Sequence, residues 1–211
     1  LCWWNYSVHY PIQAPQDLIE KYQQRQGVQR PAYYAMIEGM DRAIGKVLKH
    51  LETSGKADET LVIFTSDNGS LFENLPLRAN KGYLYEGGIR VPAILRYPPK
   101  VPQGETRDQI VTAMDWLPTV MDLCELQAEP SDPKPDGHSL LPLLKDSNRT
   151  SGYRGILNFQ WHNKWAVRMD EWKLIGVVGS ENYRLLSLTD VFPERKNYAS
   201  ERKDILSEML K

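Results

Sequence analysis

The stretch Leu61-Val62-Ile63-Phe64-Thr65-Ser66-Asp67-Asn68-Gly69 decides the fold of this chain. Its first five residues form a continuous, largely apolar run. Such a run is more typical of a parallel strand covered on both faces than of a half-exposed antiparallel strand. In open α/β sheets, ligands bind beyond the carboxyl ends of the strands. Asp67 and Asn68 therefore stand where a site is expected.

The segments on either side of this run predict an α/β layer fold. An amphipathic helix comes before it, beginning at Pro31, a residue suited to a first helical turn, and ending near Gly55. A helix that leads into a buried strand favours layers of helices on a sheet. Five further elements are expected in this part of the chain: strands over residues 3–10 and 91–97, helices over 17–25 and from Asp115 to about 126, and one or two helical turns over 139–145.

The pattern changes after residue 154, where short alternating segments predict an antiparallel meander. These segments cover residues 156–160, 165–169, 172–178 and 183–188, and a closing helix is expected over 200–210. We therefore predict an α/β fold in two parts. Residues 1–150 form part of a mixed, largely parallel sheet with flanking helices. Residues 151–211 form a small antiparallel C-terminal sheet with a terminal helix.

The composition narrows the class of protein. Apolar residues make up 41% and charged residues 25% of the 211 residues, as in ordinary globular proteins. The formal net charge of −1 gives no electrostatic reason to expect nucleic acid as a partner. No run approaches the roughly 18 apolar residues of a membrane span, so none is expected. Of the two cysteines, Cys124 lies on an apolar helical face and is expected to be a buried thiol.

Three segments contain candidate site residues. Asp67 and Asn68 offer one charged and one neutral oxygen donor, which suits a hard cation such as Ca²⁺ or Mg²⁺. A solvated Asx turn is the alternative for this Asp-Asn-Gly sequence. Lys81 lies in a loop with three glycines, which predicts a tight turn that brings backbone and cations near an anion. A hairpin with a solvated lysine stays open there. His9 lies at the end of the predicted strand 3–10, where a structural role is the alternative to a catalytic one.

Taken together, these segments resemble the sulfatase family, the formylglycine-dependent branch of the alkaline phosphatase superfamily. The resemblance covers nearly the whole chain and keeps the order of the family's segments. The matching segments are residues 9–11, 34–41, 61–69, 81–82, 85–90, 115–119, 136–144, 172–175 and 186–190.

The resemblance implies a sulfuric ester hydrolase and a role for each candidate residue. Asp67 and Asn68 would be two ligands of one Ca²⁺ (or Mg²⁺) ion. His9 would donate a hydrogen bond to the sulfate ester and could act as general acid to the leaving oxygen. Lys81 would bind sulfate oxygens and offset the charge that develops during S–O cleavage. Glu86 and the glycines beside it would shape the loop.

One departure from the family's pattern affects activity. The family's nucleophile is a Cys or Ser in a Cys/Ser-x-Pro/Ala-x-Arg segment, converted to formylglycine, and neither Cys2 nor Cys124 lies in such a segment. The chain opens with Leu1 inside an apolar run, without a signal peptide. We therefore expect a C-terminal portion of a sulfatase that is inactive alone, with the nucleophile and remaining metal ligands upstream.

The resemblance also implies a sulfated small molecule or sulfated carbohydrate as substrate, and a periplasmic, extracellular or lysosomal location. Two other functions stay open. A phosphoesterase of the same superfamily commonly has histidine at the position of Asn68, which suits a zinc-type two-metal centre. A non-catalytic carbohydrate-binding module is suggested by the aromatic residues Trp161, His162, Trp165 and Trp172. Specificity is expected from His138 and residues 160–164.

Overall fold

A computed structural model describes residues 1–146, 148–149 and 156–211 of the chain. These residues form two compact units, Leu1–Leu61 and Val62–Lys211, which are described separately below. The predicted domain boundary between residues 150 and 151 lies outside the described residues, so it stays a prediction.

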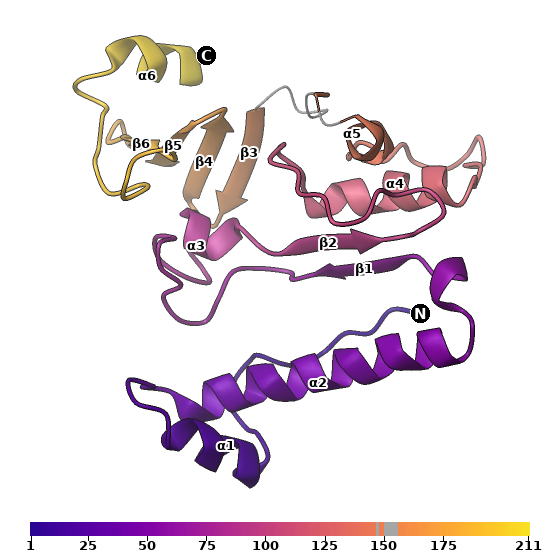
Figure 1. The fold of residues 1–211 in the computed structure, drawn as a ribbon. Coiled ribbons are helices and arrows are strands. Elements are labelled where there is room, and N and C mark those ends of the chain that lie inside the picture. Colours follow the sequence, from indigo (N-terminus) through magenta and orange to yellow (C-terminus); the bar gives the residue numbers. More distant parts are fainter. Residues whose placement is uncertain (147, 150–155) are drawn as a thin grey trace. The chain divides into compact units, whose positions relative to one another are not determined.

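The first unit is a helical hairpin. Helix α1 (Gln16–Gln23) lies beside the longer helix α2 (Pro31–Thr53), and the short 3-10 helix η1 (Ala57–Glu59) follows (Figure 1). Leu18, Ala35 and Met36 are the buried residues of the hairpin. The rings of Tyr22 and Tyr34 stack with their centroids 5.9 Å apart. The predicted helix start at Pro31 is confirmed, since proline occupies the first helical turn.

The strand predicted over residues 3–10 is wrong. Residues 1–61 are all described and include no strand, and Trp4 and Tyr6 are exposed. A strand needs a hydrogen-bonded neighbour as well as apolar side chains. The aromatic side chains of this segment indicated burial. No other segment of the first unit, however, pairs with its backbone to form a sheet.

The second unit begins with a pair of strands. Strand β1 (Val62–Thr65) pairs with β2 (Ala93–Arg96) in antiparallel register, from Val62 opposite Arg96 to Thr65 opposite Ala93. The position of β1 is confirmed, but its expected parallel direction and its place inside a sheet are not found among the described residues. The apolar run indicated burial, and burial does not fix the direction of a neighbouring strand. Here β1 is half-buried.

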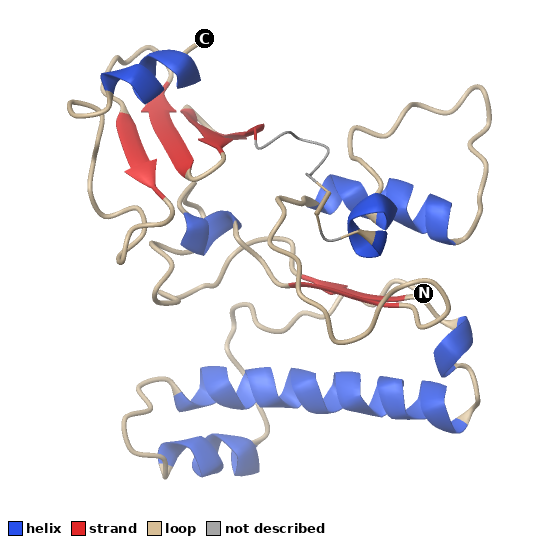
Figure 2. Cartoon of the chain, turned by 45° about the horizontal axis from the view of Figure 1, so that its top comes forward, coloured by secondary structure: helices blue, strands red, loops and turns tan. Residues whose placement is uncertain are grey.

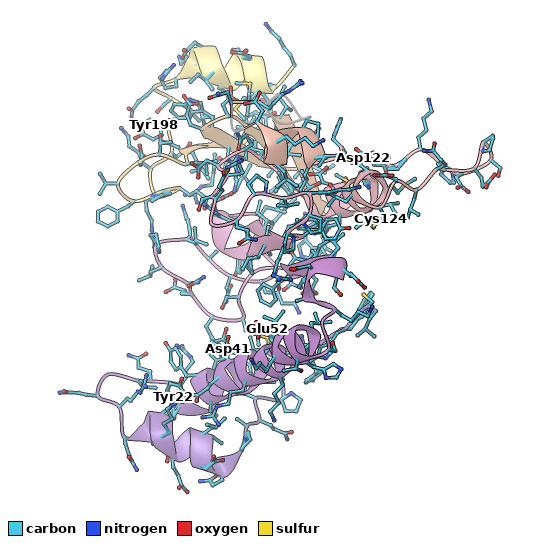
Figure 3. All side chains as sticks on the ribbon, turned by 45° about the vertical axis from the view of Figure 1, so that its right-hand side comes forward. Tyr22, Asp41, Glu52, Asp122, Cys124 and Tyr198 are labelled. Atoms are coloured by element: carbon cyan, nitrogen blue, oxygen red, sulfur yellow. The ribbon has the colours of Figure 1, made fainter. Side chains whose placement is uncertain are left out.

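Short helices surround the second strand of the pair. Helix α3 (Glu86–Ile89) lies between β1 and β2 in the sequence, and η2 (Ala113–Asp115), α4 (Trp116–Leu123) and α5 (Leu141–Lys145) come after β2. Cys124 caps the C-terminal end of α4 and is exposed, so the expected buried thiol is wrong. Helix α4 ends at Leu123, one residue before Cys124, so Cys124 does not lie on the apolar face of the helix. Figure 3 labels this residue together with Asp122, an exposed residue of the same helix.

The C-terminal part is an antiparallel meander with a terminal helix, as predicted. Strands β3 (Ile156–Trp161), β4 (Lys164–Met169), β5 (Trp172–Val177) and β6 (Arg184–Ser187) pair in that order, and helix α6 (Lys203–Met209) closes the chain (Figure 2). The mixed α/β class with a small antiparallel sheet is thereby confirmed.

This sheet packs on both faces. Leu174 and Leu185 form an apolar cluster with Ile205 and Met209 of α6. Their neighbours Ile175 and Leu186 form a second cluster with Leu84, which lies just before α3. Because successive side chains of a strand point to opposite faces, α6 and the Leu84 segment cover opposite sides of the sheet. No helix in the described ranges is both long and apolar enough to cross a membrane.

Candidate active site

The turn after β1 presents two oxygen-bearing side chains. Asp67 is exposed and Asn68 is half-buried. The Asn68 amide nitrogen donates a hydrogen bond to Asp67 Oδ2 at 2.6 Å. The Ser66 hydroxyl donates to the Asn68 carbonyl oxygen at 3.0 Å and fixes the turn. The carboxylate and amide therefore lie next to each other at the strand end.

Backbone hydrogen bonds join this turn to the loop that carries Lys81. The Gly69 N–H donates to the Gly88 carbonyl at 2.9 Å, and the Lys81 N–H donates to the Ser70 carbonyl at 2.8 Å. The Asn80 side chain adds a bond to the Leu71 carbonyl at 3.0 Å. The structure thus places Lys81 on a segment that runs beside the residues following Asp67 and Asn68.

Glycine is required where these segments touch. A Cβ atom on Gly69 would lie 2.0 Å from the Gly87 carbonyl oxygen, and one on Gly88 would lie 2.0 Å from the Tyr83 carbonyl oxygen. Real Cβ atoms do not approach backbone oxygens so closely, so any side chain would force the segments apart. The tight loop expected from the glycine pattern is confirmed.

The Lys81 side chain is available to a ligand. Lys81 is half-buried, and its ammonium group has no hydrogen-bond or ion-pair partner within the part of the chain that the structure describes. A lysine held by its backbone, with three N–H donors unused, suits an anion that arrives from outside.

His9 belongs to the first unit, whereas Asp67, Asn68 and Lys81 belong to the second. It is exposed, its Nδ1 lies 3.0 Å from the Tyr10 carbonyl oxygen, and its ring meets that of Tyr6 edge-on. The argument that placed His9 at the carboxyl end of a strand fails, because residues 3–10 form none. Its approach to the other three residues stays a prediction.

The sequence did not reveal a buried charge cluster behind the Lys81 loop. The Lys173 ammonium lies 2.5 Å from Glu86 Oε1 and 2.8 Å from Glu194 Oε1. Lys173 and Glu194 are fully buried and Glu86 nearly so. Burial raises the pKa of the Glu194 carboxyl, and the neighbouring Lys173 charge opposes that rise. The available signal was a lysine two residues before Ile175, on the same core-facing side of β5.

The donor chemistry at the end of β1 fits a hard cation, because Asp67 and Asn68 both offer oxygen. Among the described residues, no group of three or more His, Cys, Asp and Glu side chains is placed to hold a metal ion. Asp67 and Asn68 are therefore the candidate donors that this chain contributes.

The chain matches two family models. The one described as "Sulfatase" matches residues 5–126, and the one described as "N-sulphoglucosamine sulphohydrolase, C-terminal" matches residues 79–211.

Individual proteins give the same result. The uncharacterized sulfatase YdeN of Escherichia coli (strain K12) is 35% identical over 144 residues, which is 66% of this chain and 25% of that protein. The crystal structure of Ps i-CgsB in complex with k-i-k-neocarrahexaose has a TM-score of 0.82 and 27% identity, covering 97% of this chain and 46% of that one. The phosphonate monoester hydrolase of Agrobacterium radiobacter has a TM-score of 0.67 and 25% identity, covering 86% and 39%.

In these matches the chain spans between a quarter and a half of the length of the related proteins. The first family model alone accounts for more than half of the chain, and the ordered motifs agree with it. On these grounds the chain belongs to the sulfatase family.

Proposed function

We propose that this chain is the C-terminal portion of an enzyme that hydrolyses sulfate esters, and that it contributes one side of the active site. The observation that carries this proposal is the Lys81 ammonium, which has no partner among the described residues and lies on a loop hydrogen-bonded to the two residues that directly follow Asp67 and Asn68. A cation beside two metal-type oxygen donors is the arrangement that a sulfate group and its metal ion require.

Each residue then has one task. Asp67 and Asn68 would hold a Ca²⁺ or Mg²⁺ ion, which would supply positive charge to offset that of the sulfate group. Lys81 binds the sulfate through its ammonium and opposes the negative charge that grows as the S–O bond breaks. His9 donates a proton or hydrogen bond to the leaving oxygen. Formylglycine, the family's nucleophile, has no matching segment in these 211 residues, so the chain is inactive by itself.

A sulfated carbohydrate is the substrate class that we favour. Support comes from the match of residues 79–211 to the C-terminal model of N-sulphoglucosamine sulphohydrolase, and from the likeness to Ps i-CgsB, whose structure holds a neocarrahexaose. A periplasmic, extracellular or lysosomal location is the one that we propose, on the ground of the chain's membership of the sulfatase family.

The likeness to a phosphonate monoester hydrolase supports a phosphoryl-type substrate as the second candidate. Asn68 argues against it, because an amide oxygen suits one hard ion better than a zinc-type pair of metals. The carbohydrate-binding module is disfavoured, because only Trp161 and His162 of its four aromatic residues are exposed, whereas Trp165 and Trp172 pack against the apolar cluster that includes α6. Side chains committed to a core do not form an exposed sugar platform.

The proposal is tested on the full-length protein that contains this chain, with 4-nitrophenyl sulfate and 4-nitrophenyl phosphate as probes. We expect the sulfate ester to be hydrolysed with the higher kcat/KM. Lys81→Ala should lower kcat/KM for the sulfate ester by about 10²- to 10³-fold, because it removes charge stabilisation in the transition state.

Lys134→Ala is the matched control, since Lys134 is an exposed lysine in the loop after α4. It should leave kcat/KM unchanged. Circular dichroism should show the same fold for both variants. Wild-type turnover in the Lys81→Ala protein would contradict the assignment, and preference for the phosphate ester would favour the second candidate.

A further inference from the structure

The loop that carries Lys81 comprises residues 78–88. One distant residue, Glu194, forms hydrogen bonds near both ends of this loop. At one end, Glu194 Oε2 accepts a hydrogen bond from the Glu86 backbone N–H at 2.8 Å. At the other end, the Glu194 backbone carbonyl accepts a hydrogen bond from the Arg78 guanidinium. The ends also meet directly, because the Gly87 N–H donates to the Arg78 carbonyl at 2.8 Å.

Lys173 of β5 connects Glu194 and the Lys81 loop to the C-terminal sheet. Its ammonium binds Glu194 Oε1 at 2.8 Å and Glu86 Oε1 at 2.5 Å, and Arg168 of β4 lies 4.0 Å from Glu86 Oε2. All three members of the Glu86–Lys173–Glu194 cluster are buried. A buried ion cluster adds little net stability compared with apolar residues, but it tolerates few alternative arrangements and so can fix a register.

Apolar and aromatic contacts hold the same loop to the same sheet. Leu84 packs with Ala166, Ile175 and Leu186. The Tyr85 ring contacts the guanidinium groups of Arg78, 4.3 Å from the ring centroid, and Arg184, 5.8 Å from it. Leu84 and Tyr85, a few residues after Lys81, are therefore packed against the core of the C-terminal sheet.

The backbone of Glu194 supports a special role. Its φ is 61°, in the left-handed region that non-glycine residues seldom occupy, although glycine would adopt it without strain. A glutamate in this conformation directs both its carbonyl and its carboxylate toward the Lys81 loop.

We infer that Glu194 is a positioning residue for Lys81. Together with Lys173, Glu194 attaches the sulfate-binding loop to the C-terminal sheet and so fixes where Lys81 lies. This inference rests on the proposed function. Glu194 itself is buried behind the loop and does not touch the substrate. Its effect on catalysis passes through the backbone of residues 78–88.

The test uses the full-length protein with Glu194→Ala and Glu194→Gln. The glutamine variant retains an acceptor for the Glu86 N–H, whereas alanine removes both side-chain contacts. The matched control is Glu201→Gln, because Glu201 is an exposed glutamate that pairs with Lys196 at 2.7 Å. Three quantities are measured: hydrogen exchange of peptides covering residues 78–88, kcat and KM for 4-nitrophenyl sulfate, and the inhibition constant of inorganic sulfate.

We expect Glu194→Ala to speed exchange in residues 78–88, lower kcat/KM by about 10-fold or more, and weaken inhibition by sulfate by a similar factor. Glu194→Gln should show a smaller change in the same direction, and Glu201→Gln none. A residue that only stabilises the fold would lower the melting temperature but leave kcat/KM and sulfate inhibition of the folded enzyme unchanged. That result, or wild-type exchange in residues 78–88, would overturn the inference.

If Glu194→Ala does not fold, Glu194→Gln and Lys173→Met decide by the same three measurements. The two proposals fail in different ways. A wild-type protein that neither hydrolyses the sulfate ester nor responds to sulfate defeats the proposed function, and with it the catalytic role of Glu194. An active wild-type protein whose Glu194 variants keep normal kinetics defeats only the positioning role.

Discussion

At the scale of single residues, Asp115 shows how one buried side chain fixes two segments. Its carboxylate accepts hydrogen bonds from the Thr112 N–H at 2.7 Å and the His138 N–H at 2.8 Å. Its carbonyl accepts one from the Thr119 hydroxyl, which in turn accepts the Leu140 N–H. Asp115 therefore ties the start of α4 to the segment that leads into α5.

Asp115→Asn should lower the free energy of unfolding by about 2–4 kcal/mol. The amide keeps one acceptor oxygen but turns an NH₂ group toward the second backbone N–H, so one of the two hydrogen bonds that join the segments is lost. Urea denaturation of the chain measures the change. Asp122→Asn, at the exposed position of the same helix that Figure 3 labels, is the control and should stay within about 0.5 kcal/mol of wild type. Equal effects of the two substitutions would contradict this account.

At the scale of elements, Glu38 joins the two helices of the first unit. Its carboxylate accepts hydrogen bonds from Lys21 of α1 at 2.7 Å and Arg42 of α2 at 2.6 Å. The hydrogen bond from Lys21, followed by that from Tyr22, lowers the pKa of Glu38 to about 2. Figure 3 labels Tyr22 on the first helix of this pair. The ionised carboxylate is thus the form that holds α1 against α2.

This pKa gives the α1–α2 hairpin a defined response to acid. Because the pKa is lowered from 4.5, the contribution of Glu38 to stability is fully present above pH 4.5 and is lost as the pH falls through about 2. Carbon-13 NMR of the Glu38 carboxyl should show its inflection at about 2. Lys21→Met should move that inflection upward, while Lys46→Met, at an exposed position of α2, should not. An inflection near 4.5 in the wild type would show that the contact does not form.

At the scale of the whole molecule, the features that depend on neighbouring residues were predicted better than those that depend on residues far apart in the sequence. The turn of Asp67 and Asn68 after a strand, the glycine-rich loop of Lys81 and the meander of β3–β6 follow from neighbouring residues, and each was found in place. Glycine spacing and apolar alternation act within a few residues, so a sequence contains them directly.

The features that the sequence did not predict depend on partners far along the chain. Lys173 meets Glu86 across 87 positions, and Glu86 meets Glu194 across 108. The alternation of β5 puts Lys173 on the core-facing side, but nothing near Glu86 or Glu194 in the sequence indicates that they are its partners. The failed strand over residues 3–10 has the same cause, because apolar side chains are local whereas a backbone partner is not.

Titration with Ca²⁺ tests whether this chain binds the metal ion without the rest of the protein. Asp67 and Asn68 offer their oxygens at the end of β1, and the described residues provide no cluster of three or more His, Cys, Asp and Glu side chains for a metal. Ca²⁺ takes about six to eight oxygen ligands, and two of them leave most of its hydration shell in place. We therefore expect isothermal titration of the 211-residue chain with Ca²⁺ to show weak binding or none.

The full-length protein is the positive control for this titration and should bind Ca²⁺ with a stoichiometry near one. In that protein Asp67→Ala should weaken binding strongly, because the charged ligand is lost. The exposed Asp58→Ala, in η1, should leave binding unchanged. Tight, stoichiometric binding of Ca²⁺ by the 211-residue chain would mean that its own residues complete the site. The division of the metal ligands between this chain and the rest of the protein would then be wrong.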